Sequence, residues 1–423
     1  MGSTQSIDPE KARDFAVKTV EKLRAANFIS YWAGGCVRDY HLQITPKDYD
    51  VATDASPDEI RRLFGKKRTL AIGASFGVIT LIGSKEHGNI EIATFRQDES
   101  YTDGRRPDQV TFSTPEKDAQ RRDFTVNGMF FDPTTMETID YVGGLADLQK
   151  KQIRAIGSPA ERFDEDKLRI FRAIRFATTL DFQIEPDTLD AVCRFVDNLS
   201  QVSRERILVE LEKTLSSPFR LRGIDLLAET GILPYVLPET TPNESAISLL
   251  KSLLSLLPLH ETALTLAAIY KALAPELTAK SVKRTLKSMK TSNEIAEKTC
   301  WILGHVDQLI DADTLPWPTI QRLLIHPYAS DTLTLARALV DKTPALPPKL
   351  QGIQFCEAKL KLSSDQLNPP ELISGAELIQ LGMTPGPAFS KVLKEVRDQQ
   401  LLGEIDSTQQ ALELAQQTYA SMK

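Results

Sequence analysis

The sequence is poor in the residues that build disulfide frameworks and histidine metal clusters. Its 423 residues contain only four cysteines and five histidines. The cysteines lie far apart and form no Cys-x-x-Cys pair, so the sequence indicates neither a disulfide framework nor a zinc site with thiolate ligands, and reduced thiols are the simple interpretation. The histidines are scattered and no His-Asp dipeptide occurs, so neither a histidine metal site nor an appended HD-type phosphohydrolase is supported. Any chemistry must therefore come from other side chains.

Long apolar runs and a strong net charge are also missing. The most apolar stretch, residues 249–268, is interrupted by charged residues, histidine and proline, so it predicts a buried helix and not a membrane span. The 51 Lys and Arg against 57 Asp and Glu give a net charge of -6, which excludes a protein that is basic all over but leaves room for a local basic groove. We expect a cytoplasmic protein with no membrane contact and no stable protein partner.

The two parts of the chain differ in predicted secondary structure. Short β-rich runs alternate with Gly, Asp and Pro turns from about residue 29 to 156, and a leading helix opens at Asp8-Pro9 and runs to about Asn27. After about Glu161 helical periodicity takes over. The expected fold class is α+β, with a mixed-sheet head followed by an all-α remainder. The predicted strands are residues 29–33, 49–53, 76–82, 90–95, 110–112 and 138–142.

The first informative stretch is Tyr31-Trp-Ala-Gly-Gly-Cys-Val-Arg-Asp39. Gly34 and Gly35 let the backbone approach a bulky anion, and Arg38 adds a charged fork suited to phosphate. Asp48 and Asp50 follow, two apart in a predicted strand, so both project to one face and offer paired carboxylates for a hard cation such as Mg²⁺. A Gly-Gly hairpin turn and a solvated strand face are the plainer alternatives. The two features lie in one strand-turn-strand unit, which favours a phosphate and metal site.

These residues resemble the first motif of the class II branch of the nucleotidyltransferase superfamily. That branch holds bacterial and eukaryotic CCA-adding tRNA nucleotidyltransferases and bacterial poly(A) polymerases. Stretches similar to its other motifs follow in order, and residues 375–405 are similar to its C-terminal segment. The stretches are Arg121-Arg-Asp-Phe-Thr-Val-Asn127, Asp140-Tyr-Val-Gly-Gly-Leu-Ala-Asp147, Glu165-Asp-Lys-Leu-Arg169 and Arg206-x-x-x-Glu210.

The resemblance implies a metal-dependent enzyme with four parts. They are a catalytic head over residues 1–155, a helical neck with the nucleotide-selecting motif over 156–218, a helical body over 219–362 and a helical RNA-binding tail over 363–423. Arg122 would supply charge for a triphosphate, and Asp123 and Asn127 polar contacts to a ribose or to the loop that holds it. A solvated charged turn is the alternative for this second motif.

Asp166 and Arg169 stand at i,i+3 on a predicted helix. Asp166 presents only acceptors and Arg169 only donors. Cytosine and adenine both show an amino donor beside an acceptor, whereas uracil and guanine place a carbonyl where the amino group sits. An unpaired group costs about 1–3 kcal/mol, enough for appreciable rejection. An ordinary surface salt bridge is the alternative. The resemblance implies that this pair reads the base and that Arg172 and Arg175 assist around the nucleotide.

Glu91 is the candidate third carboxylate. Strand alternation puts it on one face with Ala93 and Phe95, and a solvated strand face is the alternative. The polar stretch of residues 96–107 is typical of a loop. The resemblance implies that a loop there accompanies the final A-addition, which argues against an enzyme that adds only CC.

Two clusters of basic residues are candidates for RNA contacts. One is Arg61, Arg62, Lys66, Lys67 and Arg68, and the other is a stripe at helical spacing, Lys280, Lys283, Arg284, Lys287 and Lys290. Phosphate binding and a solubilising surface both explain such clusters.

The predicted function is template-independent addition of C and/or A from CTP and ATP to the 3′ end of tRNA, with Mg²⁺. The alternatives are an A-adding enzyme, a poly(A) polymerase and, from another class, a catalytically dead RNA-binding protein.

Overall fold

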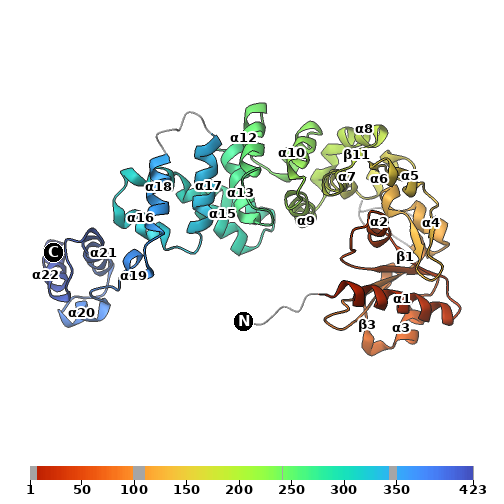
Figure 1. Ribbon diagram of the computed structural model, residues 1–423, viewed down its shortest axis with the longest axis horizontal. Helices are drawn as coiled ribbons and strands as arrows, with labels where there is room; N and C mark the ends of the chain where they lie inside the picture. The colour runs from red at the N-terminus through yellow and green to blue at the C-terminus, as the bar shows by residue number, and fades with distance from the viewer. Residues whose placement is uncertain (1–6, 99–109, 241, 343–349, 423) are drawn as a thin grey trace. The chain divides into compact units, whose positions relative to one another are not determined.

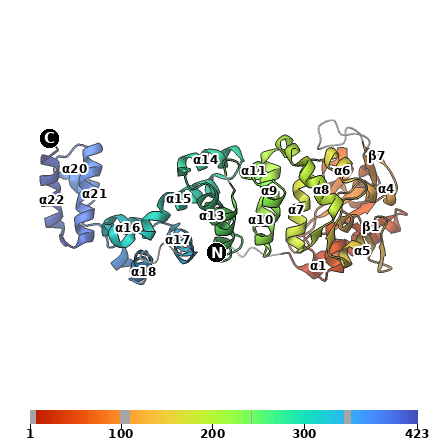
Figure 2. The ribbon, with the colours of Figure 1, turned by 90° about the horizontal axis from the view of Figure 1, so that it is seen from above.

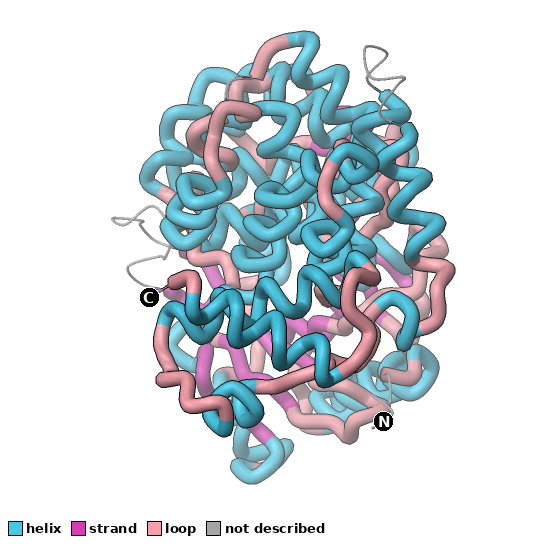
Figure 3. Tube along the Cα trace, turned by 90° about the vertical axis from the view of Figure 1, so that its left-hand side faces the viewer, coloured by secondary structure: helices cyan, strands magenta, loops and turns pink. Residues whose placement is uncertain are grey.

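The computed structural model describes residues 7–98, 110–240, 242–342 and 350–422. The chain forms two compact units, Met1–Pro238 and Glu239–Lys423. All described strands, magenta in Figure 3, belong to the first unit, and the described part of the second is helical. The expected α+β class is therefore confirmed. The fourfold division into head, neck, body and tail stays a prediction.

A seven-stranded mixed sheet forms the base of the first unit, in the order β3-β4-β5-β2-β1-β8-β9. The pair β2 and β5 is parallel, and the other pairs are antiparallel. The strands are β1 Ser30–Ala33, β2 Asp50–Thr53, β3 Thr69–Gly73, β4 Val78–Leu81, β5 Ile90–Thr94, β8 Phe130–Asp132 and β9 Glu137–Ile139. Two small sheets add β6 Arg96–Asp98 with β7 Val110–Phe112, and β10 Gln152–Ile153 with β11 Gln183–Ile184.

The two faces of the sheet have different coverings. Helices α1 (Pro9–Ala25) and α3 (Pro57–Phe64) lie on one face, where they bury Val51, Ile79 and Ile92 (Figure 1). The opposite face carries a separate apolar cluster that includes Ala52, Phe95 and Phe130. Asp50 alternates with Ala52 along β2, so its side chain belongs to this second face. The short helices α2 (Gly35–His41) and α4 (Pro115–Gln120) join the strands on this side.

A helical segment completes the first unit. Phe171 and Ile174 on α7 are fully buried, and Leu168 is nearly so, as their spacing predicts. Helix α9 packs along α7. The helices are α5 Gly144–Gln149, α6 Pro159–Glu165, α7 Leu168–Leu180, α8 Pro186–Phe195, α9 Arg204–Leu215, α10 Arg220–Glu229 and α11 Leu233–Val236.

The second unit is a stack of helices, with α13, α14 and α15 side by side (Figure 2). Its last three helices share an apolar cluster of their own, centred on Leu378, Val392 and Ala411. Among the described residues, no helix is long and apolar enough to cross a membrane. The helices are α12 Glu244–Leu254, α13 Thr262–Leu273, α14 Ala279–Ser288, α15 Asn293–Ile310, α16 Trp317–Leu324, α17 Ala329–Lys342, α18 Leu350–Lys359, α19 Ser364–Leu367, α20 Gly375–Gln380, α21 Pro387–Leu402 and α22 Thr408–Ala420.

Three expectations about the fold need correction. Strand β3, at the edge of the main sheet, directly follows the basic cluster that ends at Arg68 and was not among the predicted strands. Strand β8 is only three residues long, and the sequence analysis missed it. Strand β11 interrupts the region expected to be helical, because two residues of it pair with β10.

Candidate active site

One cavity of about 420 Å³ lies in the first unit, on the side of the sheet that carries Asp50. Six arginines and three aspartates line it, so the lining has an excess of positive charge suited to a polyanion. They come from α2, β2, the segment after α4, the junction of α6 and α7, α7 itself and α9. The lining residues are Gly34, Gly35, Arg38, Asp50, Arg121, Arg122, Asp123, Asn127, Asp166, Arg169, Arg172, Phe176 and Arg206.

Most of the predicted site residues line this cavity, but Asp48, Glu91 and Arg175 do not. The lining also includes Arg121, Phe176 and Arg206, which the sequence analysis left out of the site. Arg121 and Arg206 lie in stretches that resemble family motifs, so a signal for them was present.

The glycine turn needs its first glycine for two reasons. Gly34 has φ 73°, a left-handed conformation that side chains disfavour. A Cβ on Gly34 would also lie 3.1 Å from Nη1 of Arg122. The turn therefore brings the backbone between β1 and α2 close to an arginine of the cavity, as a phosphate site requires.

The carboxylates at the sheet are arranged differently from the prediction. Asp50 begins β2, whereas Asp48 is exposed in the loop before it. The pairing of β1 with β2 stops at Ala33 opposite Asp50, since α2 starts at Gly35, so no strand partner remains for Asp48. Glu91 is the register partner of Asp50 in the parallel pair of β2 and β5, which puts both residues on the same face.

The surroundings of Asp50 disfavour its ionised form when no cation is bound. Burial, together with the nearby negative charges of Glu91 and Asp48, raises its pKa to about 7 against the opposing effect of Arg122. Oxygen donors of this kind suit a hard divalent cation. No group of three or more His, Cys, Asp or Glu among the described residues is placed to hold a metal ion.

Asp118 on α4 anchors both arginines of the second motif. Its carboxylate is buried and accepts hydrogen bonds from Arg121 at 2.6 Å and from Arg122 at 2.9 Å. Burial opposes ionisation of Asp118, but the two guanidinium groups outweigh it and hold its pKa below the usual range. Arg122 also donates to the backbone oxygen of Asn127 at 3.4 Å.

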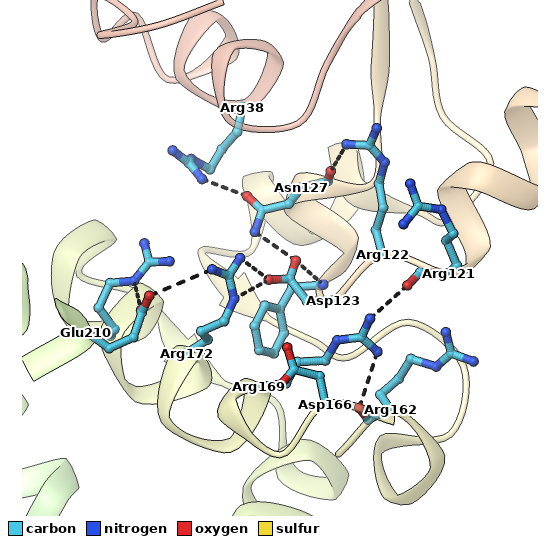
Figure 4. A network of polar contacts seen from close by, with 12 residues as sticks. Arg38, Arg121, Arg122, Asp123, Asn127, Arg162, Asp166, Arg169, Arg172 and Glu210 are labelled. Carbon is cyan, nitrogen blue, oxygen red and sulfur yellow. Dashed lines mark hydrogen bonds and ion pairs between the residues drawn. The ribbon is translucent and has the colours of Figure 1, made fainter. Parts of the chain in front are cut away.

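Asp123 lies at the centre of a polar network that crosses the cavity wall (Figure 4). It accepts from Arg172 Nε at 2.8 Å and from Asn127 Nδ2 at 3.1 Å. Asn127 Oδ1 accepts in turn from Arg38 at 2.6 Å. Burial would raise the pKa of Asp123, but Arg172 lowers it far below its usual range. In the structure Asp123 and Asn127 hold Arg172 and Arg38, and their predicted contacts to a ribose or to the loop that holds it stay a prediction.

Asp166 does not lie on a helix with Arg169. It follows the last residue of α6, in extended conformation, and α7 begins at Leu168. Its Oδ1 accepts a hydrogen bond from the N–H of Leu168, the first residue of α7, at 3.1 Å. Asp166 thus lies at the break between α6 and α7. Its Oδ2 accepts from Arg206 at 2.7 Å. A carboxylate has about four acceptor positions, so about two remain for a ligand.

Arg169 is likewise held without being saturated. It donates to Glu165 at 2.6 Å and to the backbone oxygens of Arg162 at 3.2 Å and Arg121 at 3.0 Å. Two of its five N–H groups are left for a ligand in the cavity. Asp166 and Arg169 thus border the same cavity, and each is fixed by a different partner. Figure 4 shows the contacts of Arg169 with the backbone of Arg121 and Arg162.

Two residues of the fifth motif, on α9, form ion pairs with the fourth motif and with α7. Arg206 and Glu210 stand at i,i+4, where they face Asp166 and two arginines of α7 respectively. Glu210 is buried and accepts from Arg175 Nε at 2.7 Å. The Arg175 guanidinium lies 3.4 Å from the centroid of the Phe176 ring, so Arg175 contributes to the wall behind the cavity.

The comparisons with known proteins agree with this geometry. A family model for the poly(A) polymerase head domain matches residues 30–154, and a model for a probable RNA and SrmB binding site of polymerase A matches residues 181–243. A model for the second domain of tRNA nucleotidyltransferases matches residues 259–415. The chain is therefore an enzyme of the nucleotidyltransferase class.

Curated relatives narrow the family. The chain is 34% identical to the CCA-adding enzyme of Streptococcus gordonii over 384 residues, which cover 90% of this chain and 91% of that one. It is 34% identical to the CCA-adding enzyme of Lactococcus lactis over 405 residues, 94% and 95% of the two chains. The chain belongs to the family of CCA-adding enzymes.

Solved structures show the same fold. The CCA-adding enzyme of Bacillus stearothermophilus in complex with CTP matches with a TM-score of 0.74 at 25% identity, over 97% of this chain and 98% of that one. The Thermotoga maritima enzyme complexed with tRNA matches with a TM-score of 0.69 at 22% identity, over 99% and 97%. Membership of this family implies a divalent metal ion, and the carboxylate oxygens at Asp50 fit one.

Proposed function

We propose that this enzyme adds C, C and A to the 3′ end of tRNA from CTP and ATP, without a nucleic-acid template and with Mg²⁺. The observation that carries the proposal is the cavity itself, in which arginines for a triphosphate, a carboxylate for a metal, and the pair Asp166 and Arg169 border one space. The four cysteines are free thiols, which supports the expected cytoplasmic location.

The chain's own groups divide the work of the reaction. Arg38 and Arg122 hold the triphosphate through charge-assisted hydrogen bonds, and Asp118 and Asn127 keep them oriented. Asp166 accepts from the amino group of cytosine or adenine, and Arg169 donates to the neighbouring ring acceptor. Asp48 and Asp50 are the candidate ligands of the divalent ion, and Glu91, beside Asp50, is a candidate third carboxylate of the site. A bound ion would acidify the attacking 3′-hydroxyl and offset charge on the leaving pyrophosphate.

The test is incorporation of labelled CTP and ATP into three tRNA transcripts that end before the first C, after C, and after CC. Full CCA addition is expected from all three starting points. Addition of A alone would select an A-adding enzyme, and a long A tail would select a poly(A) polymerase. Residues 99–109, in the predicted loop of the final A-addition, lie outside the described residues.

The metal-site assignment has its own test. Asp48→Ala is expected to abolish incorporation while binding of tRNA, measured by fluorescence anisotropy, survives. Wild-type turnover in this variant would contradict the role of Asp48 as a metal ligand. RNA binding that survives in Asp48→Ala shows that the variant is folded and has lost only the chemistry. Turnover by the wild-type protein excludes the alternative of a catalytically dead RNA-binding protein.

A further inference from the structure

A row of residues in register crosses the main sheet through the candidate metal site. Leu70 on β3 pairs with Thr80 on β4, Thr80 with Glu91 on β5, and Glu91 with Asp50 on β2. Side chains in register on adjacent strands lie on one face. At about 4.8 Å between strands, the row extends roughly 14 Å beyond Asp50 toward the edge of the sheet.

This end of the sheet has one closed face and one open face. Ile79, Leu81 and Ile92 alternate with the residues of the row and are fully buried beneath α3. Glu91 is exposed, Thr80 is half-buried, and Leu70 keeps 42% of its surface exposed. The open face thus consists of small and aliphatic side chains that lead directly to two carboxylates.

The open face has a basic rim. Lys66, Lys67 and Arg68 form the short helix η1 (Lys66–Arg68) that leads directly into β3, and all three are exposed. None of the three forms an ion pair with another residue that the structure describes. Unpaired lysines beside an apolar strand suit a ligand that carries both phosphates and flat bases.

The nucleotide cavity lies on the other side of Asp50. Its remaining lining comes from the β1–α2 turn, the segment after α4, α7 and α9, and it includes neither Glu91 nor any residue farther along the row. An in-line displacement needs the attacking and leaving groups on opposite sides of the reacting phosphorus. If the triphosphate occupies the cavity, the attacking hydroxyl must reach Asp50 from the side of Glu91.

We propose that the open face of β3, β4 and β5, from Glu91 to Leu70 with the rim Lys66 to Arg68, binds the last nucleotides of the RNA that is being extended. The assignment rests on the proposed function and adds the surface that receives its second substrate. Continuity with the carboxylates and the positive rim favour RNA over a protein as the occupant.

Two variants that place opposite charges at the exposed residue Leu70 test the assignment in the full-length enzyme. Leu70→Glu is expected to raise the KM for a tRNA transcript that ends in CC about fivefold to tenfold, because the new charge repels phosphate. The KM for ATP should stay within twofold. Leu70→Lys is expected to leave the KM for RNA unchanged or lower it. An equal rise in both variants would show that loss of leucine matters and not charge, and would overturn the proposal.

A charge-matched pair of double variants provides the control. Lys66→Gln with Lys67→Gln should raise the KM for RNA and flatten its salt dependence by about 0.7 in slope for each lost phosphate contact. Lys18→Gln with Lys22→Gln removes the same charge from α1, on the opposite face of the sheet, and should change neither. If the wild-type enzyme incorporates nucleotides but the two double variants behave alike, the surface assignment is wrong while the proposed function stands. Absence of incorporation by the wild-type enzyme would instead refute the proposed function.

Discussion

At the scale of the residue, Asp50 combines a half-buried carboxylate with two negative neighbours, Glu91 and Asp48, and one nearby positive charge, Arg122. Its pKa, raised from 3.8 to about 7, means that the folded protein prefers the neutral acid. The unfolded chain ionises near pH 4, so this residue lowers the free energy of unfolding progressively as the pH rises from about 4 to about 7. Above pH 7 the full cost of the partly desolvated charge remains unless a cation offsets it.

We therefore expect Asp50→Asn to stabilise the metal-free enzyme in a pH-dependent way. With chelator present, its Tm should exceed that of the wild type by several degrees at pH 8 and should match it near pH 4, measured by differential scanning calorimetry. Added Mg²⁺ should raise the Tm of the wild type at pH 8 and have little effect on the variant. A variant less stable than the wild type at pH 8 would contradict the proposal that ionised Asp50 destabilises the metal-free enzyme.

Asp166 carries the second prediction at this scale. Asp166→Ala removes the acceptor proposed to meet the amino group of C and A, so discrimination against UTP should fall by about tenfold or more. The measurement is kcat/KM for CTP, ATP and UTP on one transcript. Arg206→Ala offers a graded comparison, because it leaves the carboxylate in place but removes the 2.7 Å contact that orients it. Unchanged rejection of UTP in Asp166→Ala would exclude a base-reading role.

At the scale of the element, α4 acts as a support for the triphosphate site. Asp118 lies one turn before Arg121 and Arg122, and its single carboxylate serves both guanidinium groups. Asp118→Asn keeps the shape but removes the charge that orients them. The KM for CTP and for ATP should rise together, by about tenfold, with base choice unchanged.

Asp132, on β8 of the main sheet, provides a matched control. Asp132→Asn breaks the ion pair between Asp132 and Arg24, which is 2.7 Å long and contributes nothing to the lining of the cavity. It should lower the Tm without raising either nucleotide KM. If Asp132→Asn raised the nucleotide KM values as much as Asp118→Asn, the effect would reflect stability and not support of the site.

The elements also show where sequence reasoning reaches its limit. The strands that carry Asp50 and Glu91 and the helix from Leu168 were predictable, because periodicity and turn residues are local properties. The break at Asp166 had a local signal too, since aspartate favours the residues just before a helix. The pairs of Asp123 with Arg172 and of Asp166 with Arg206 join residues 49 and 40 apart. Local pattern does not encode such contacts, so the sequence could not show that Asp123, which lines the cavity, pairs with Arg172.

At the scale of the whole molecule, the second unit supplies a second positive surface. On α14 the apolar residues Val282 and Leu286 are buried, while three residues of the expected stripe, Lys280, Arg284 and Lys287, are exposed on the helix. Of the other two, Lys283 is half-buried and pairs with Glu297, and Lys290 lies beyond the end of α14. Formal negative charge on the whole chain is thus compatible with local attraction for RNA. Such attraction should depend steeply on salt, because each neutralised phosphate releases counterions.

The resulting prediction separates RNA affinity from chemistry. Lys280→Gln with Lys287→Gln should raise the KM for tRNA severalfold at 0.15 M salt and reduce the slope of log KM against log salt, with kcat and the nucleotide KM values unchanged. The pair Lys18→Gln with Lys22→Gln again provides equal loss of charge. Because a solubilising helix face would respond to neither salt nor RNA, an α14 variant that behaves like this control would assign the stripe to solubility. A reduced slope would instead make α14 part of the surface that holds the tRNA while Asp166 and Arg169 select each nucleotide.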